Sequence, residues 1–132
     1  MTRRELSQLY YLNREIESLK TRYMALETAS TSCTAQISDM PSNRTQESKV
    51  EKLGAEMVDI SELISLSIKR SEVEVRRLYR YIDDIPSSEL RLIFTYRYLN
   101  GLSWARISEC FGIIGDGDRE RKKHDRFMFN KR

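Results

Sequence analysis

The feature that most constrains the fold is a seam of apolar residues near the N-terminus, spaced alternately by three and four positions. This alternation places every member on one face of a helix of about 27 residues, roughly 40 Å long. The intervening residues are polar, so we expect the helix to contact one or two others rather than to be buried on all sides. The seam consists of Leu9, Leu12, Ile16, Leu19, Tyr23 and Leu26.

A second long helix is predicted from about Gln46 to Asp83. Its apolar positions keep the three-and-four alternation up to Ile64 and shift from Ile68 onward, which indicates a stutter or a change of packing partner along one helix. The regular part contains Val50, Leu53, Met57, Ile60 and Ile64. Residues 28–48 between the two helices are rich in Ser and Thr and include Pro41, which predicts an irregular linker.

Composition supports an all-α fold. The 132 residues are 39% hydrophobic and 33% charged, with only five Gly and two Pro, which favours long exposed helices over disorder. We therefore predict a helical arm, either a coiled coil or a hairpin, over residues 1–84. Residues 85–132 are predicted to form a separate domain of three shorter helices.

Helix boundaries in residues 85–132 follow from local signals. Pro86 ends the long helix, and Ser87 or Ser88 caps the next one, whose apolar face ends at Tyr98. Gly101 stops that helix, Ser103 caps a short one, and Gly112 stops it in turn.

The last helix has Asp118 as its predicted N-cap and Phe127 as its apolar anchor. The turn before it, "GIIGDGD", is longer than the three or four residues usual in a helix-turn-helix and contains three glycines. Polar residues also occupy the first turns of the helix. We therefore expect this helix to dock loosely in the absence of a ligand.

The positive charge lies at the C-terminal end. Residues 1–84 carry 13 Lys or Arg and 14 Asp or Glu, whereas residues 117–132 carry seven Lys or Arg and three Asp or Glu. A solvated basic tail is the simpler interpretation, but the position after two short helices favours contact with a polyanion.

The segment "IPSSELRLIFTYRYLNGLSWARISECFG" resembles region 4 of bacterial sigma factors and the activators that share its fold. The chain is also similar to phage late-gene transcriptional regulators of the ArpU/RinA kind. The similarity lies in its size, its heptad-bearing first half and its closing pattern "RYxxGLSWxxI…FG…R…RF", which covers the last ~48 residues. The resemblance implies a helix-turn-helix that binds double-stranded DNA and activates late genes at a promoter, with RNA polymerase as a further partner. Matching positions include Pro86, Arg97, Tyr98, Gly101, Leu102, Ser103, Ile107, Phe111 and Gly112.

An α-helix fits the major groove, where Arg and Lys donate to guanine O6 and N7. The candidates for base contacts are Arg119, Lys122 and Lys123, and the candidates for phosphate contacts are Arg121, Arg126, Lys131 and Arg132. Ser103 is a helix cap in any interpretation, and the backbone amides after it are a further candidate phosphate contact. Trp104 is interpreted as a packing residue.

The heptad seams have two possible uses. The two long helices can fold back as an antiparallel pair within one chain, or they can associate between chains. We favour a homodimer, because two-fold proteins bind two half-sites. The candidate oligomerisation residues are Leu9, Leu12, Ile16, Leu19, Tyr23, Leu26, Leu53, Met57, Ile60 and Ile64.

Other functions are weaker interpretations of the same features. The small DNA-recognition subunit of a phage packaging terminase also joins a helix-turn-helix to helical oligomerisation segments, and a sigma-factor mimic or anti-sigma protein would bind polymerase without DNA. An enzyme is not expected, because His124 is the only histidine and has no second candidate base near it.

No cofactor or metal is expected either. Cys33 and Cys110 show neither metal-ligand nor disulfide spacing, and the Asp83–Asp84 pair is interpreted as a helix end. "MTRRELSQ" lacks an apolar signal core and no apolar stretch approaches the roughly 20 residues of a membrane span, so we expect a protein of the bacterial host cytoplasm, away from the membrane.

Overall fold

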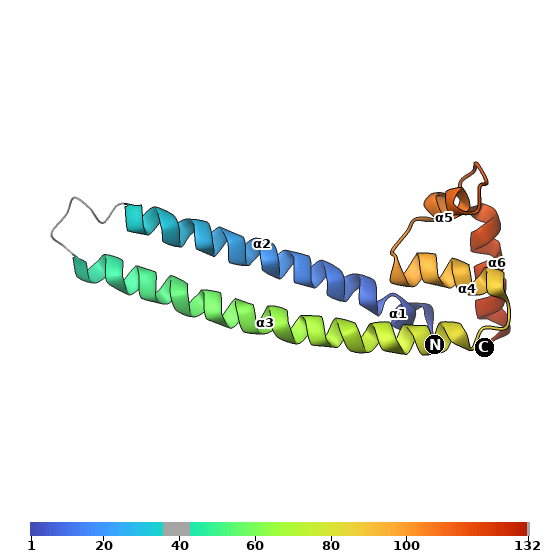
Figure 1. The fold of residues 1–132 in the computed structure, drawn as a ribbon, viewed down its shortest axis with the longest axis horizontal. Helices are drawn as coiled ribbons and strands as arrows, with labels where there is room; N and C mark the ends of the chain where they lie inside the picture. Colours follow the sequence, from blue (N-terminus) through green and yellow to red (C-terminus); the bar gives the residue numbers. More distant parts are fainter. Residues whose placement is uncertain (36–42, 132) are drawn as a thin grey trace. The chain divides into compact units, whose positions relative to one another are not determined.

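A computed structural model describes residues 1–35 and 43–131, and the side chains of residues 1–32 and 48–131. Within these residues the chain is helical and contains no strand, which confirms the predicted all-α class (Figure 1). None of the described helices is long and apolar enough to cross a membrane. The elements are α1 (Arg3–Leu6), α2 (Gln8–Ala35), α3 (Asn43–Asp83), α4 (Ser88–Phe94), the π-helical turn η1 (Thr95–Leu99), α5 (Trp104–Cys110) and α6 (Asp118–Asn130).

The predicted linker over residues 28–48 is wrong for most of its length, because α2 continues to Ala35 and α3 begins at Asn43. Threonine hydroxyls bond back to the preceding turn: Thr28 Oγ1 donates to the carbonyl of Met24 at 3.0 Å, and Thr31 Oγ1 to that of Glu27 at 2.9 Å. These bonds satisfy the hydroxyls inside the helix, so a Ser/Thr-rich composition does not break it. Residues 36–42 of the predicted linker lie outside the described residues.

The chain divides into two compact units, residues 13–70 and residues 1–12 with 71–132. The predicted boundary between residues 84 and 85 therefore does not coincide with the division. The physical reason is the position of the core, which joins both ends of the chain.

In the unit of residues 13–70, the two helical stretches run antiparallel beside each other (Figure 1). Ile16 and Ile60 are buried, whereas the other seam positions in this unit are half-buried. A single chain thus pairs its own two seams, which is the intramolecular alternative, and association between chains through them stays a prediction. The half-buried positions are Leu19, Tyr23, Leu26, Val50, Leu53, Met57 and Ile64.

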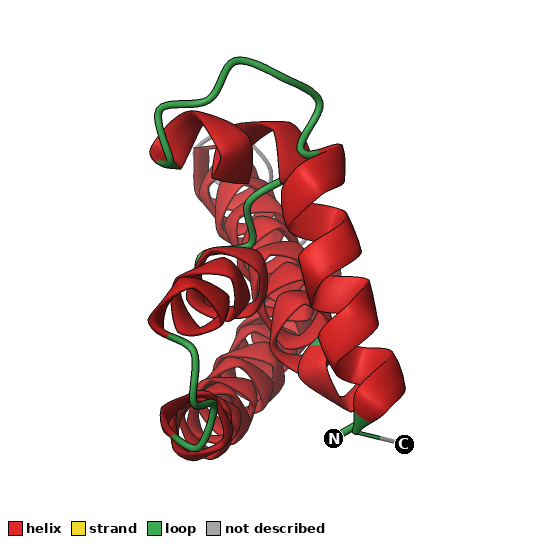
Figure 2. Cartoon of the chain, turned by 90° about the vertical axis from the view of Figure 1, so that its right-hand side faces the viewer, coloured by secondary structure: helices red, strands yellow, loops and turns green. Residues whose placement is uncertain are grey.

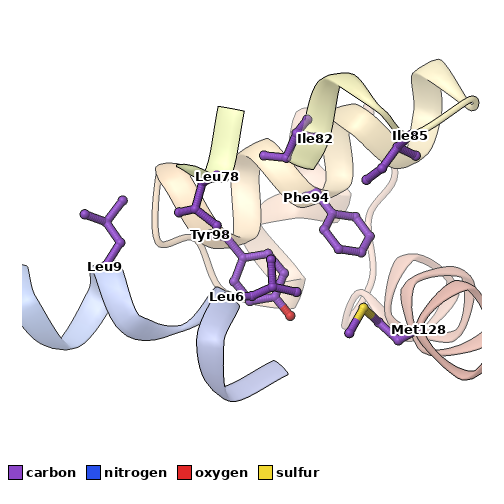
Figure 3. Close-up of a cluster of buried hydrophobic side chains, with 8 residues drawn as sticks. All are labelled: Leu6, Leu9, Leu78, Ile82, Ile85, Phe94, Tyr98 and Met128. Atoms are coloured by element: carbon purple, nitrogen blue, oxygen red, sulfur yellow. The ribbon is translucent and has the colours of Figure 1, made fainter. Parts of the chain in front are cut away.

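The core of the other unit joins segments from both ends of the sequence (Figure 3). The first residues of the chain contribute two leucines, one of them a seam position. The end of α3 contributes two aliphatic side chains, and the segment after it contributes a third. Full burial of side chains of this size contributes ~1.5–3 kcal/mol each. The buried members are Leu6, Leu9, Leu78, Ile82, Ile85, Phe94, Tyr98 and Met128.

The N-terminal segment is fixed by a capping box. The Glu5 carboxylate accepts from the Thr2 amide at 2.7 Å, and the Glu5 amide donates to Thr2 Oγ1 at 3.3 Å. The hydrogen bonds to Thr2 lower the pKa of Glu5. This local structure positions Leu6 in the core.

Candidate nucleic-acid interface

The segment α4–η1 forms as the capping signals predict. Ser87 is the N-cap and its Oγ accepts from the amide of Leu90 at 3.4 Å, while Ile93 and Phe94 are buried. The helix ends in a π turn, in which the amide of Asn100 donates to the carbonyl of Thr95 at 3.0 Å. Gly101 then takes a left-handed conformation at φ 67°, as predicted.

Helix α5 is a short capped helix with one buried side. Ser103 Oγ accepts from the amide of Arg106 at 3.4 Å, which confirms the predicted cap. Ile107 and Ser108 are buried, and Gly112 ends the helix at φ 72°. Helix α5 therefore has a fixed start and end against which the last helix can pack.

The start of α6 lies against the start of α5. Gly117 is the N-cap at φ 79°, and a Cβ atom there would lie 2.1 Å from the carbonyl oxygen of Trp104. The predicted N-cap Asp118 is therefore wrong: Asp118 is the first helical residue, and its amide donates to Asp116 Oδ1 at 3.0 Å. Only a glycine permits this close approach and this backbone conformation together.

One face of α6 packs against α4 and α5. Figure 2 shows the three helices beside one another. Glu120, His124 and Met128 are buried on this face. The expectation of loose docking is therefore wrong. The predicted anchor Phe127 is half-buried, with its ring 5.5 Å from that of Phe94.

His124 is buried on this face, with 2% of its surface exposed. Its ring lies 4.8 Å from that of Phe94 and 5.2 Å from that of Trp104, which confirms Trp104 as a packing residue. Its two nitrogens meet Tyr98 Oη at 2.8 Å and Asp125 Oδ1 at 2.9 Å. These partners remove the cost of burying a polar ring.

The chemistry of the partners fixes the proton on His124. A carboxylate only accepts, so Nδ1 carries the proton toward Asp125, and Nε2 accepts from the hydroxyl of Tyr98. Burial raises the pKa of Tyr98 to about 12 and lowers the pKa of His124, so the hydroxyl stays protonated and the imidazole neutral. Arg3 extends this series of hydrogen-bonded side chains by an ion pair to Asp125 at 2.9 Å.

The opposite face of α6 presents cations to solvent. Arg119, Lys122 and Arg126 follow one another at spacings of three and four, so they share one side of the helix. The Lys122 side chain is 72% exposed. Arg119 approaches Glu89 of α4 only at 4.0 Å, and Arg126 forms no ion pair with another described residue.

Asp118 partly neutralises the first turn of this face. It pairs with Lys122 and with Arg121, both at 2.6 Å. The bond from Lys122 is the main cause of the lowered pKa of Asp118, with a further contribution from Arg121. Arg121 and Lys122 are exposed, so they can exchange these pairs for contacts with an external anion at small cost.

The remaining predicted cations lie beside this face or away from it. Lys123 is one-third exposed and pairs with Glu89, which places it on the flank toward α4. Lys131 lies over the rings of Tyr81 and Phe127, at 4.8 and 5.2 Å from their centroids. Ser103 is exposed at the start of α5, and Arg132 lies outside the described residues.

Two cations near the N-terminus were missed by the sequence analysis. Arg3 and Arg4 line a hollow of about 950 Å³ together with Arg126 and Lys131. About 120 residues separate the two pairs in the sequence, and the only signal was the adjacent "RR" at positions 3 and 4. Arg4 adds positive charge beside the C-terminal half of α6, whereas the charge of Arg3 is balanced by its ion pair with Asp125.

Comparisons with models of protein families, with curated proteins and with solved structures found no match to this chain. The resemblance to late-gene regulators therefore stays a prediction. In the described part of the chain, no three His, Cys, Asp or Glu side chains lie close enough to hold a metal ion. The Cys110 side chain is a free, exposed thiol, and that of Cys33 lies outside the described residues.

Proposed function

We propose that this protein binds double-stranded DNA in a sequence-specific manner and acts as a transcriptional regulator. The observation that carries the proposal is the two-sided character of α6. One side packs against α4 and α5, and the other presents Arg119, Lys122 and Arg126 to solvent. An α-helix of this kind fits the major groove, and residues of its N-terminal half reach base edges.

The geometry refines the predicted roles. Arg119 and Lys122 lie in the first turns of α6 and are the proposed base-reading residues. Arg126 lies about two and a half turns from the N-cap of α6, where a phosphate contact fixes the position of the helix. Lys123 is moved from the base-reading set to the phosphate-contacting flank, because its ammonium group pairs with Glu89.

The biological setting is proposed from the resemblance alone. It is a phage or prophage activator of late genes that works in the host cytoplasm and contacts bacterial RNA polymerase. Recovery of bound DNA from infected or lysogenic cells tests this setting, because an activator should be found at promoters of packaging, structural or lysis genes.

DNA binding is tested by selecting bound sequences from a random duplex pool with the full chain. We expect one motif to be enriched, with an affinity that falls as salt rises by a log–log slope of about −0.9 per phosphate contacted. A pool that remains random would contradict the proposed specificity. Polymerase capture without any retention of duplex would indicate the sigma-mimic class.

The joining of a helical hairpin to the cationic C-terminal helices also fits the small subunit of a packaging terminase. That function requires a ring of many copies and stimulation of a partner ATPase. Light scattering that found eight or more copies per particle would favour it over a regulator.

A further inference from the structure

Helix α3 carries a second apolar seam that α2 does not cover. Leu63 and Leu66 are 48% and 46% exposed, and they are flanked at heptad spacing by the exposed Asp59 and Arg70. These four positions lie roughly 120° around the helix from Ile60 and Ile64, which face α2. We call this surface the 59–70 face, together with Glu62 and Lys69 beside it.

We propose that the 59–70 face binds the same face of a second copy of the chain, with the two α3 helices antiparallel. The pattern is self-complementary about a point midway between residues 64 and 65. A two-fold axis there places Leu63 opposite the partner's Leu66, and Asp59 opposite the partner's Arg70. Each pairing occurs twice, as a closed two-fold interface requires.

The charges at the edge of the seam follow the same symmetry. In antiparallel pairing at this register, Glu62 lies beside the partner's Lys69, and Lys69 beside the partner's Glu62. None of these edge charges, nor Asp59 or Arg70, forms an ion pair with another described residue, so all are available to a second chain.

The charges also oppose the parallel alternative. Parallel, in-register pairing would place Asp59 against the partner's Asp59 and Arg70 against the partner's Arg70. Like charges at these positions select against that arrangement, as in natural pairs of helices whose charges set their orientation.

This contact differs from the association predicted from the main seam. The main seam is used within the chain, where Ile16 and Ile60 are buried. The 59–70 face leaves that pairing intact, so two folded hairpins can associate without opening. A seam with two leucines per chain is short, which places the interface among the small, reversible ones.

Sedimentation over a range of protein concentrations, with the full chain, tests the proposal. Asp59→Arg alone and Arg70→Asp alone each make both symmetric pairs repulsive, so each should raise the dimer Kd about tenfold or more. The double variant Asp59→Arg/Arg70→Asp restores opposite charges in both symmetric pairs and should dimerise like the wild type. Glu72→Arg is the matched control, because Glu72 is exposed on another side of α3, and it should leave the Kd unchanged.

All substituted positions are exposed, so far-UV circular dichroism should show unchanged helicity. If a variant loses helicity, Lys69→Glu tests the same register and should weaken the dimer through the partner's Glu62. A wild type that stays monomeric overturns the proposal. So do single variants that associate like the wild type, or a double variant that fails to recover. The proposal does not rest on DNA binding, and duplex affinity of the same samples is read separately.

Discussion

At the scale of single residues, the imidazole of His124 connects α6 to the rest of its unit. Tyr98 donates to Nε2, and Asp125, held by Arg3, accepts from Nδ1. Tyr98→Phe leaves Nε2 buried without a donor, which we expect to lower the free energy of unfolding by about 1–3 kcal/mol. Urea denaturation measures this loss. Tyr79→Phe on the exposed surface is the control and should have little effect. If the two variants were equally stable, the hydrogen bond from Tyr98 to His124 would not contribute to the stability of the fold.

The same ring predicts a pH dependence. Burial lowers the pKa of His124 in the folded chain, so the unfolded chain binds the proton more tightly. The neutral imidazole therefore favours the folded state fully above the pKa of the unfolded chain, near 6.5. This contribution is lost as the pH falls from there toward the pKa of His124 in the folded chain. Urea midpoints should therefore decrease between pH 7.5 and 5.5, with a smaller decrease for His124→Gln. Parallel curves for the two proteins would assign the dependence to other groups.

At the scale of elements, the docking of α6 depends on a glycine. Gly117 and Gly112 both have positive φ, but only at Gly117 does an added Cβ meet backbone, 2.1 Å from the oxygen of Trp104. Gly112→Ala should cost ~1–2 kcal/mol for the left-handed conformation. Gly117→Ala adds the clash, and we expect a clearly larger loss with partial release of α6, measured by thermal unfolding and amide exchange. If both variants lost the same stability, the close approach of Gly117 to Trp104 would not contribute to the docking of α6.

The comparison of sequence and structure is also clearest for elements. Local chemistry predicts a cap at Ser87 or Ser88, a cap at Ser103 and the glycine stops at 101 and 112, because each depends on a few adjacent residues. It fails at Asp118, because the cap there is decided by the approach to α5 from residues far away in the sequence. The helix over residues 28–35 was missed because a Ser/Thr-rich composition is the same for a linker and for a helix whose hydroxyls bond to the preceding turn.

For the candidate site, the basic positions of α6 could be read from the sequence, but their division between faces could not. The buried state of His124 depends on a partner far away in the sequence, Tyr98. Arg3 and Arg4 lie beside α6 because the fold brings the N-terminal residues next to the C-terminal helix. Long-range packing of this kind leaves no local pattern.

At the scale of the whole molecule, the core that supports α6 includes residues from both ends of the sequence. Leu6, Leu9, Leu78 and Ile82 all lie outside residues 85–132. A fragment of residues 85–132 should therefore show low helicity and no cooperative unfolding, in contrast to the full chain. A fragment that unfolds at the temperature of the full chain would restore the boundary predicted at residue 84.

The central claim is that the exposed face of α6 reads bases. Its most direct test compares Lys122→Ala and Arg126→Ala with the wild type, each titrated against the selected duplex and a scrambled duplex. Lys122→Ala should cost ~1–3 kcal/mol on the selected duplex and little on the scrambled one, whereas Arg126→Ala should weaken both alike. If Lys122→Ala discriminates between the two duplexes as well as the wild type does, α6 does not read sequence through this face.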